Sequence, residues 1–127
     1  SSGKGEVMSH PIRACLVCIL TALLAACGSG TPTPEPLTIV IKASEFHFET
    51  PTIAARVGQT VTIRLENAGV LEHSLAIDVL GVKLDNVRPG QTGEVTFTPQ
   101  RAGTYTYECK VAGHAAAGMA GALTVTP

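Results

Sequence analysis

The chain has 127 residues, which is enough for one small domain and a targeting segment. Its formal net charge at pH 7 is −1, from nine basic and ten acidic side chains. That balance excludes a general nucleic-acid binder, which carries a strong excess of basic side chains. Hydrophobic residues make up 45% of the chain, but part of them lie in one apolar run near the N-terminus and do not belong to a core.

Residues 1–26 are interpreted as a signal peptide preceded by a few extra residues. Residues 8–13 carry a positive charge, and residues 14–26 form an uninterrupted apolar run. The run is shorter than the roughly 20 residues of a transmembrane helix and fits the hydrophobic region of a secretory signal. The whole segment is therefore excluded from the expected fold.

Residues 24–27 (LAAC) resemble the lipobox of bacterial lipoproteins. In that family the cysteine is lipidated and becomes the new N-terminus. The resemblance implies a lipid on Cys27 and a domain anchored to a membrane of the cell envelope, facing the periplasm or the exterior. Residues 28–36 are rich in Gly and Pro and are expected to form a linker to a domain at residues 37–127. The alternative is an ordinary signal peptide or a single membrane span.

The four cysteines do not indicate a disulfide framework. Cys15 and Cys18 form a C-x-x-C pair, but they lie inside the apolar run and lack the strand–turn–helix context of a redox motif. If Cys27 carries the lipid, Cys109 is the one remaining thiol of the domain. A disulfide within the domain is therefore excluded.

From residue 37 onward the hydrophobic pattern has a period of two, which is typical of β-strands. In residues 60–67, for example, Val61, Ile63 and Leu65 alternate with polar side chains. Turn residues separate the runs, and there is no convincing amphipathic helix. These features predict an all-β fold, an antiparallel β-sandwich. The expected strands are residues 38–43, 60–67, 73–78, 93–98, 103–109 and 120–125.

Four side chains form a pattern that favours a redox metal. Cys109, His114 and Met119 are spaced C-x4-H-x4-M between the last two expected strands, and His73 opens a strand far upstream. Cu(I) prefers thiolate and thioether, whereas imidazole suits both copper oxidation states. Two histidines, one cysteine and a weak axial methionine are the donor set of blue-copper electron transfer. Each residue alone has an ordinary structural interpretation, and zinc is the alternative metal, although a thioether is a poor zinc ligand.

The chain resembles the cupredoxin family over residues 37–127, most closely its small auracyanin- or plastocyanin-like members. The resemblance is carried by residues 57–61 (VGQTV), 72–75 (EHSL), 103–109 (GTYTYEC) and the loop that follows. It implies a Greek-key β-sandwich of the eight-stranded type and one type 1 copper ion. Cys109 would be the thiolate ligand, His73 and His114 the imidazole ligands, and Met119 the axial thioether. Many relatives have Asn after the first histidine, where this chain has Ser74, whose hydroxyl can still bond the ligand loop.

The functions considered are a one-electron carrier, an enzyme, and a copper chaperone or store. Copper enzymes need further copper sites and several more histidines, but only His47 is left, and it is expected on a surface strand. Glu72 and Glu108, which flank ligands, are assigned to solvent. An electron carrier that is not an enzyme is therefore expected, with the chaperone or store as the alternative because it would use the same ligands.

The protein is expected to be a monomer. Its expected partners are redox proteins, a donor and an acceptor, that dock over His114. Around His114, residues 113 and 115–118 are only Gly and Ala, which would leave a flat apolar patch. Lys110 is the only charged side chain near it in sequence. We therefore expect weak electrostatic steering.

Overall fold

The structure is a computed structural model and describes residues 2, 3, 5, 28 and 30–127. The expected signal segment lies outside the described residues, and so do Cys15, Cys18 and the proposed lipid site Cys27. Among the residues that are described, no helix is long and apolar enough to cross a membrane. The chain divides into two units, residues 1–30 and residues 31–127, and the second unit carries the fold.

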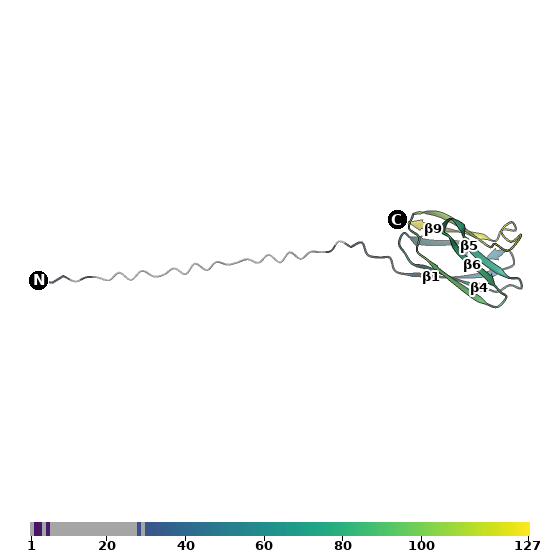
Figure 1. Cartoon of the computed structure of the whole chain (residues 1–127), viewed down its shortest axis with the longest axis horizontal. Helices are drawn as coiled ribbons and strands as arrows, with labels where there is room; N and C mark the ends of the chain where they lie inside the picture. Colours follow the sequence, from purple (N-terminus) through teal and green to yellow (C-terminus); the bar gives the residue numbers. More distant parts are fainter. Residues whose placement is uncertain (1, 4, 6–27, 29) are drawn as a thin grey trace. The chain divides into compact units, whose positions relative to one another are not determined.

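Strands dominate the second unit and form two sheets (Figure 1). One sheet has the order β2-β1-β4-β7 and the other the order β3-β9-β8-β5-β6. The elements are β1 (Leu37–Ser44), β2 (His47–Phe48), β3 (Thr52–Arg56), β4 (Val61–Asn67), β5 (His73–Ile77), the 3₁₀ turn η1 (Asp78–Leu80), β6 (Val82–Val87), β7 (Thr92–Phe97), β8 (Gly103–Glu108) and β9 (Ala120–Thr126).

The predicted all-β sandwich is confirmed, but it is not purely antiparallel and has more strands than expected. β1 pairs with β4 in parallel, and β3 pairs with β9 in parallel. Parallel neighbours need a long crossover between them, and residues 45–60, which include β2 and β3, supply it for β1 and β4. The remaining pairings are antiparallel.

The core lies between the two sheets and follows the alternation of the sequence. Val61, Ile63 and Leu65 of β4 are completely buried, as the period of two predicts. From the other sheet, Leu75 and Tyr107 are equally buried. Removing a large aliphatic side chain from water contributes about 1.5–3 kcal/mol, so the two inner faces stabilise the sandwich without any metal.

Three strands were not predicted from the sequence, namely β2, β3 and β6. β2 has only two residues. In β3 exposed and buried residues alternate, but two of its five residues are alanines, which give a weak hydrophobic pattern. β6 buries only its two ends, Val82 and Val87. The expected alternation of β5 is also absent, because all five of its residues are buried between β8 and β6.

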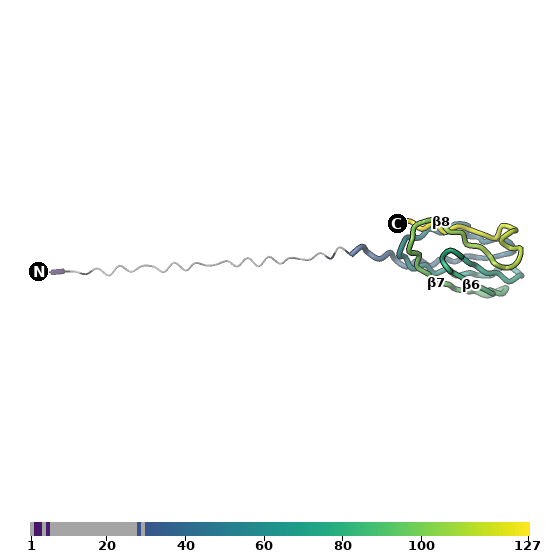
Figure 2. The backbone as a smooth tube through the Cα atoms, turned by 45° about the horizontal axis from the view of Figure 1, so that its top comes forward, coloured from purple at the N-terminus to yellow at the C-terminus, as the bar shows by residue number. Residues whose placement is uncertain are grey.

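The two ends of the sandwich differ in what they carry. β8 and β9 are antiparallel, with Gly103 opposite Val125 at one end and Glu108 opposite Ala120 at the other. The C-terminus and the start of β1 lie at the first end, whereas the loop between β8 and β9 lies at the second (Figures 1 and 2). We call the second end the loop end, and it is where the candidate site is found.

Candidate metal centre

The fold brings His73, Cys109 and His114 together at the loop end. His73 is the first residue of β5, Cys109 follows the last residue of β8, and His114 lies in the connection from β8 to β9. Their ligand atoms all lie within 4.8 Å of one another, and all three side chains are buried. Residues far apart in the sequence therefore form one cluster, as the spacing and the upstream histidine predicted.

Met119, the fourth predicted residue, is held against the other two loop residues by the backbone. The N–H of Cys109 donates to the carbonyl of Met119, and the N–H of Met119 donates to the carbonyl of His114, both at 3.1 Å. Met119 is completely buried. The loop is thus closed on itself, and the relative positions of Cys109, His114 and Met119 are fixed by main-chain bonds and not by side-chain packing alone.

The spacing of the donor atoms suits a single small ion. The Sγ atom of Cys109 lies 3.5 Å from Nδ1 of His114. With metal–ligand bonds of about 2.0–2.3 Å, donors around one ion lie roughly 3.4–3.9 Å apart. The rings of His73 and His114 have their centroids 5.2 Å apart and are tilted by 59°, so they do not stack face to face.

His73 provides the clearest sign that the cluster is built for a metal. It is completely buried, and neither of its ring nitrogens has a hydrogen-bond partner among the residues that the structure describes. Buried polar atoms normally have partners, so an ion at the ring edge explains the exception. Burial, reinforced by the neighbouring His114, lowers the pKa of His73. The neutral imidazole that a metal requires is therefore favoured, and the four residues fit a copper ion.

Ser74 connects the sulfur ligand to the neighbouring strand. Its backbone N–H donates to Sγ of Cys109 at 3.4 Å, and its hydroxyl oxygen lies 3.7 Å from the same sulfur. The hydroxyl oxygen also accepts a 2.7 Å hydrogen bond from the N–H of Lys110. The expectation that a serine after the first histidine can bond the ligand loop is confirmed.

Sequence reasoning missed two residues of the centre, Glu45 and Phe46, in the turn between β1 and β2. The Oε1 atom of Glu45 lies 3.7 Å from Nε2 of His73. The ring of Phe46 meets the ring of His114 edge-on, with centroids 5.1 Å apart. No motif marks these residues, and the turn approaches the ligands only because β1 ends beside the end of β4, from which the chain leads to His73. A non-glycine residue with positive φ, as at Phe46 (61°), is uncommon and is often found at functional sites.

The carboxylates that flank the ligands differ in their surroundings. Glu72 is exposed, as expected. Glu108 is only partly exposed, and its carboxylate accepts a 2.6 Å bond from Lys110, which also pairs with Asp78 at 2.5 Å. Glu108 therefore lies at the surface, as expected, but it is paired with a lysine. His47 is exposed on β2 and is not one of the clustered residues, as expected.

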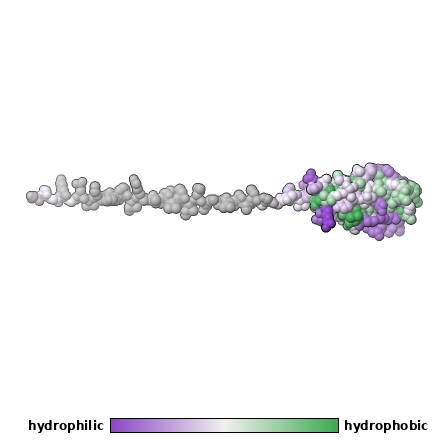
Figure 3. All heavy atoms as spheres, turned by 90° about the horizontal axis from the view of Figure 1, so that it is seen from above, coloured by the Kyte–Doolittle hydropathy of each residue, from purple (hydrophilic) through white to green (hydrophobic). Residues whose placement is uncertain are grey.

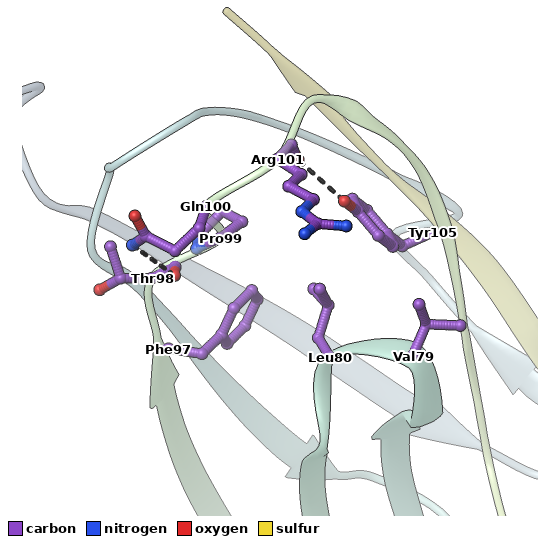
Figure 4. Close-up of a pocket in the computed structure, with 8 residues that line it drawn as sticks. All are labelled: Val79, Leu80, Phe97, Thr98, Pro99, Gln100, Arg101 and Tyr105. Atoms are coloured by element: carbon purple, nitrogen blue, oxygen red, sulfur yellow. Dashed lines mark hydrogen bonds between the residues drawn. The ribbon is translucent and has the colours of Figure 1, made fainter.

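A separate pocket lies away from the metal centre (Figure 4). It is bordered by apolar side chains of η1 and β7, including Leu80 and Phe97, and by Arg101 and Tyr105. The hydroxyl of Tyr105 donates to the carbonyl of Arg101 at 2.8 Å. None of the residues that line this pocket belongs to the ligand cluster.

The chain is similar to a group of known copper proteins. Its sequence matches the cupredoxin-like domain family over residues 16–125. Auracyanin-A of Chloroflexus aurantiacus is 31% identical, in an alignment that covers 84% of this chain and 93% of that protein. The solved structure of auracyanin A from the same bacterium, a "blue" copper protein, has a TM-score of 0.62 and 27% identity over 71% of this chain and 98% of that chain. Reduced auracyanin of Roseiflexus castenholzii has a TM-score of 0.65 at 23% identity, over 77% of this chain and 100% of that chain, which bears on the fold alone.

Proposed function

We propose a function for this chain from the fact that it belongs to the cupredoxin-like domain family. It is a one-electron carrier and catalyses no reaction of its own. His73, Cys109, His114 and Met119 form its type 1 copper site. When bound there, copper supplies a centre that cycles between Cu(I) and Cu(II). The observation that carries the proposal is the buried set of two imidazoles and one thiol within 4.8 Å.

The surroundings of the ligands suit electron transfer. The main-chain bonds of the loop and the contacts of Ser74 hold the donor atoms in one arrangement. Such a rigid set changes little between oxidation states, and a small rearrangement makes electron transfer fast. The burial of all three clustered ligands also keeps water away from the thiolate.

The test is to add Cu(II) to the purified domain and record its visible spectrum during a redox titration. An intense band near the red end of the visible spectrum and a reversible one-electron transition are expected. Cys109→Ser should abolish the band while the far-UV circular dichroism stays that of a β-sandwich. If the domain binds one equivalent of copper but shows no such band, the proposal is refuted. Rapid copper transfer to a chelator would instead favour the alternative, a chaperone or store.

We further propose that the domain is held on a membrane of the cell envelope by a lipid on Cys27. The support is the lipobox-like run at residues 24–27 and the Gly- and Pro-rich residues that follow. Mass spectrometry of protein extracted from membranes tests this directly. A diacylated N-terminal Cys27 is expected, and an unmodified Cys27 or a retained residue 8–26 segment would refute the anchor.

We also propose that the redox partners dock at the loop end. Phe46, Val70 and Leu71 are exposed apolar side chains close to the ligands, since Phe46 contacts His114 and the other two are bonded to Glu45. Ala116 and Ala117, which follow His114 in the ligand loop, are also exposed. Weakly hydrophobic residues gather at this end of the domain in Figure 3. A small apolar surface suits a transient complex that must release quickly.

The one basic side chain of the ligand loop, Lys110, is already paired. Lys110 is bonded to both Asp78 and Glu108, so it adds little free charge to the loop end. Weak dependence of the transfer rate on ionic strength is therefore expected.

A further inference from the structure

The carboxylate of Glu45 is held in a defined position by the loop between β4 and β5. Its Oε1 atom accepts hydrogen bonds from the backbone N–H of Val70 at 2.6 Å and of Leu71 at 3.0 Å. Two main-chain donors on one oxygen fix a side chain that would otherwise move freely on the surface. The position of this carboxylate is therefore a property of the fold.

The same loop is shaped by the buried side chain of Asn67. Its Nδ2 donates to the carbonyls of Leu71 at 2.7 Å and Val87 at 2.8 Å, and its Oδ1 accepts from the N–H of Gly69 at 2.9 Å. Gly69 also provides space, because a Cβ atom there would collide with the carboxylate of Glu45. The loop thus has both the donors and the room for this one side chain.

This arrangement places a negative charge beside a buried ligand. Oε1 of Glu45 lies 3.7 Å from Nε2 of His73, and that nitrogen has no hydrogen-bond partner in the described part of the chain. The separation is longer than a hydrogen bond, so the contact is electrostatic. It favours an Nε2 that carries the proton, which leaves Nδ1 as the nitrogen with a free lone pair.

We propose that Glu45 is a positioning residue for the metal centre. Before metal binds, Glu45 selects the Nε2–H tautomer of His73, and after copper binds it lowers the reduction potential of the centre. The second half rests on the proposed copper function. A fixed anion near the centre stabilises Cu(II) more than Cu(I), since the oxidised site carries one more positive charge. An imidazole whose far N–H faces a carboxylate is also a stronger donor.

The tautomer is measured first, by ¹⁵N NMR of the His73 ring in the metal-free wild-type protein. The Nε2–H form is expected to predominate, and Glu45→Ala should raise the share of the Nδ1–H form. If Nδ1–H predominates in the wild type, or if the two proteins have the same tautomer populations, the proposal is wrong. This readout needs no copper, so it is independent of the proposed function.

The potential is measured next, in three copper-loaded variants whose fold is checked by circular dichroism. Glu45→Gln removes the charge where it stands, and Gly69→Ala keeps the charge but displaces it. Glu72→Gln is the control, since it removes an exposed charge that is next to His73 in sequence but forms no ion pair with it in the described part of the chain. Both test variants should raise the potential, and the control should shift it less.

Equal shifts for Glu45→Gln and Glu72→Gln would refute the effect on the potential. If Glu45→Gln does not fold, the potential of Gly69→Ala tests the effect on the copper centre, and the tautomer of His73 in the wild type tests the first half of the proposal. If the wild type binds no copper, the proposed function fails while the tautomer result stands by itself.

Discussion

The hydroxyl of Ser74 joins two strands of the metal centre, because its oxygen accepts the N–H of Lys110 at 2.7 Å. With its oxygen occupied in this way, the hydroxyl proton is free to point at Sγ of Cys109, 3.7 Å away. A single small side chain therefore both closes the end of β8 onto β5 and places a dipole next to the sulfur ligand.

Ser74→Ala should lower both the stability and the reduction potential. The N–H of Lys110 loses its acceptor, which costs about 1 kcal/mol. The sulfur loses a donor that draws electron density away and favours the electron-rich Cu(I) state. Urea denaturation of the metal-free protein and a redox titration of the copper protein measure the two effects. An unchanged potential would mean that the hydroxyl proton points elsewhere.

Copper binding should raise the melting temperature of the domain without being needed for folding. Within the described part of the chain, the two ring nitrogens of His73 are buried without hydrogen-bond partners, and each such group costs about 1–3 kcal/mol. When one of these nitrogens coordinates copper, its cost is removed. Each kcal/mol of stability gained raises the melting temperature by about 4–8 °C in a domain of this size. Calorimetry of the metal-free and Cu(I) proteins measures the difference. A metal-free protein that is unfolded, or that melts at the same temperature, would contradict this expectation.

Stability should fall steeply above pH 10 because of Tyr107. Burial raises the pKa of Tyr107 to about 12, and its hydroxyl donates to the carbonyl of Thr50. The unfolded chain loses this proton near pH 10 while the folded chain keeps it. The contribution of protonated Tyr107 to the free energy of unfolding is therefore full below pH 10 and decreases by about 1.4 kcal/mol per pH unit up to about pH 12. Urea unfolding between pH 9 and 11.5 measures this loss, which Tyr107→Phe should reduce.

A charge placed in the loop should slow electron transfer to the natural partner. Ala116→Glu buries an unpaired carboxylate in the proposed contact, and a tenfold slower second-order rate, equivalent to about 1.4 kcal/mol, is expected. The visible spectrum should not change, since Ala116 is not a ligand. Ala102→Glu, an exposed alanine at the opposite end of the sandwich, is the matched control. Equal rates for both variants would locate the docking surface elsewhere.

The sequence predicted those features that depend on local pattern. The alternation of Val61, Ile63 and Leu65 identified β4, and the C-x4-H-x4-M spacing identified three residues of the site because one short loop contains them. It did not predict β3 or β6, whose buried residues are few or small. Nor did it predict Glu45, since the contact with His73 depends on the parallel pairing of β1 with β4. Such pairing leaves no local signal.

Leu37 and the copper ligands lie far apart within the folded unit of residues 31–127. The chain enters the sandwich at Leu37, beside Val61, and the ligand loop lies at the other end of β8, which is six residues long. At about 3.3 Å per residue, the metal is roughly 20 Å from the point of entry. The residue at which the strands begin and the ligands are therefore at opposite ends of one folded unit. A label or a tag joined ahead of Leu37 is expected to leave the ligand cluster unperturbed, because the length of the sandwich separates the two.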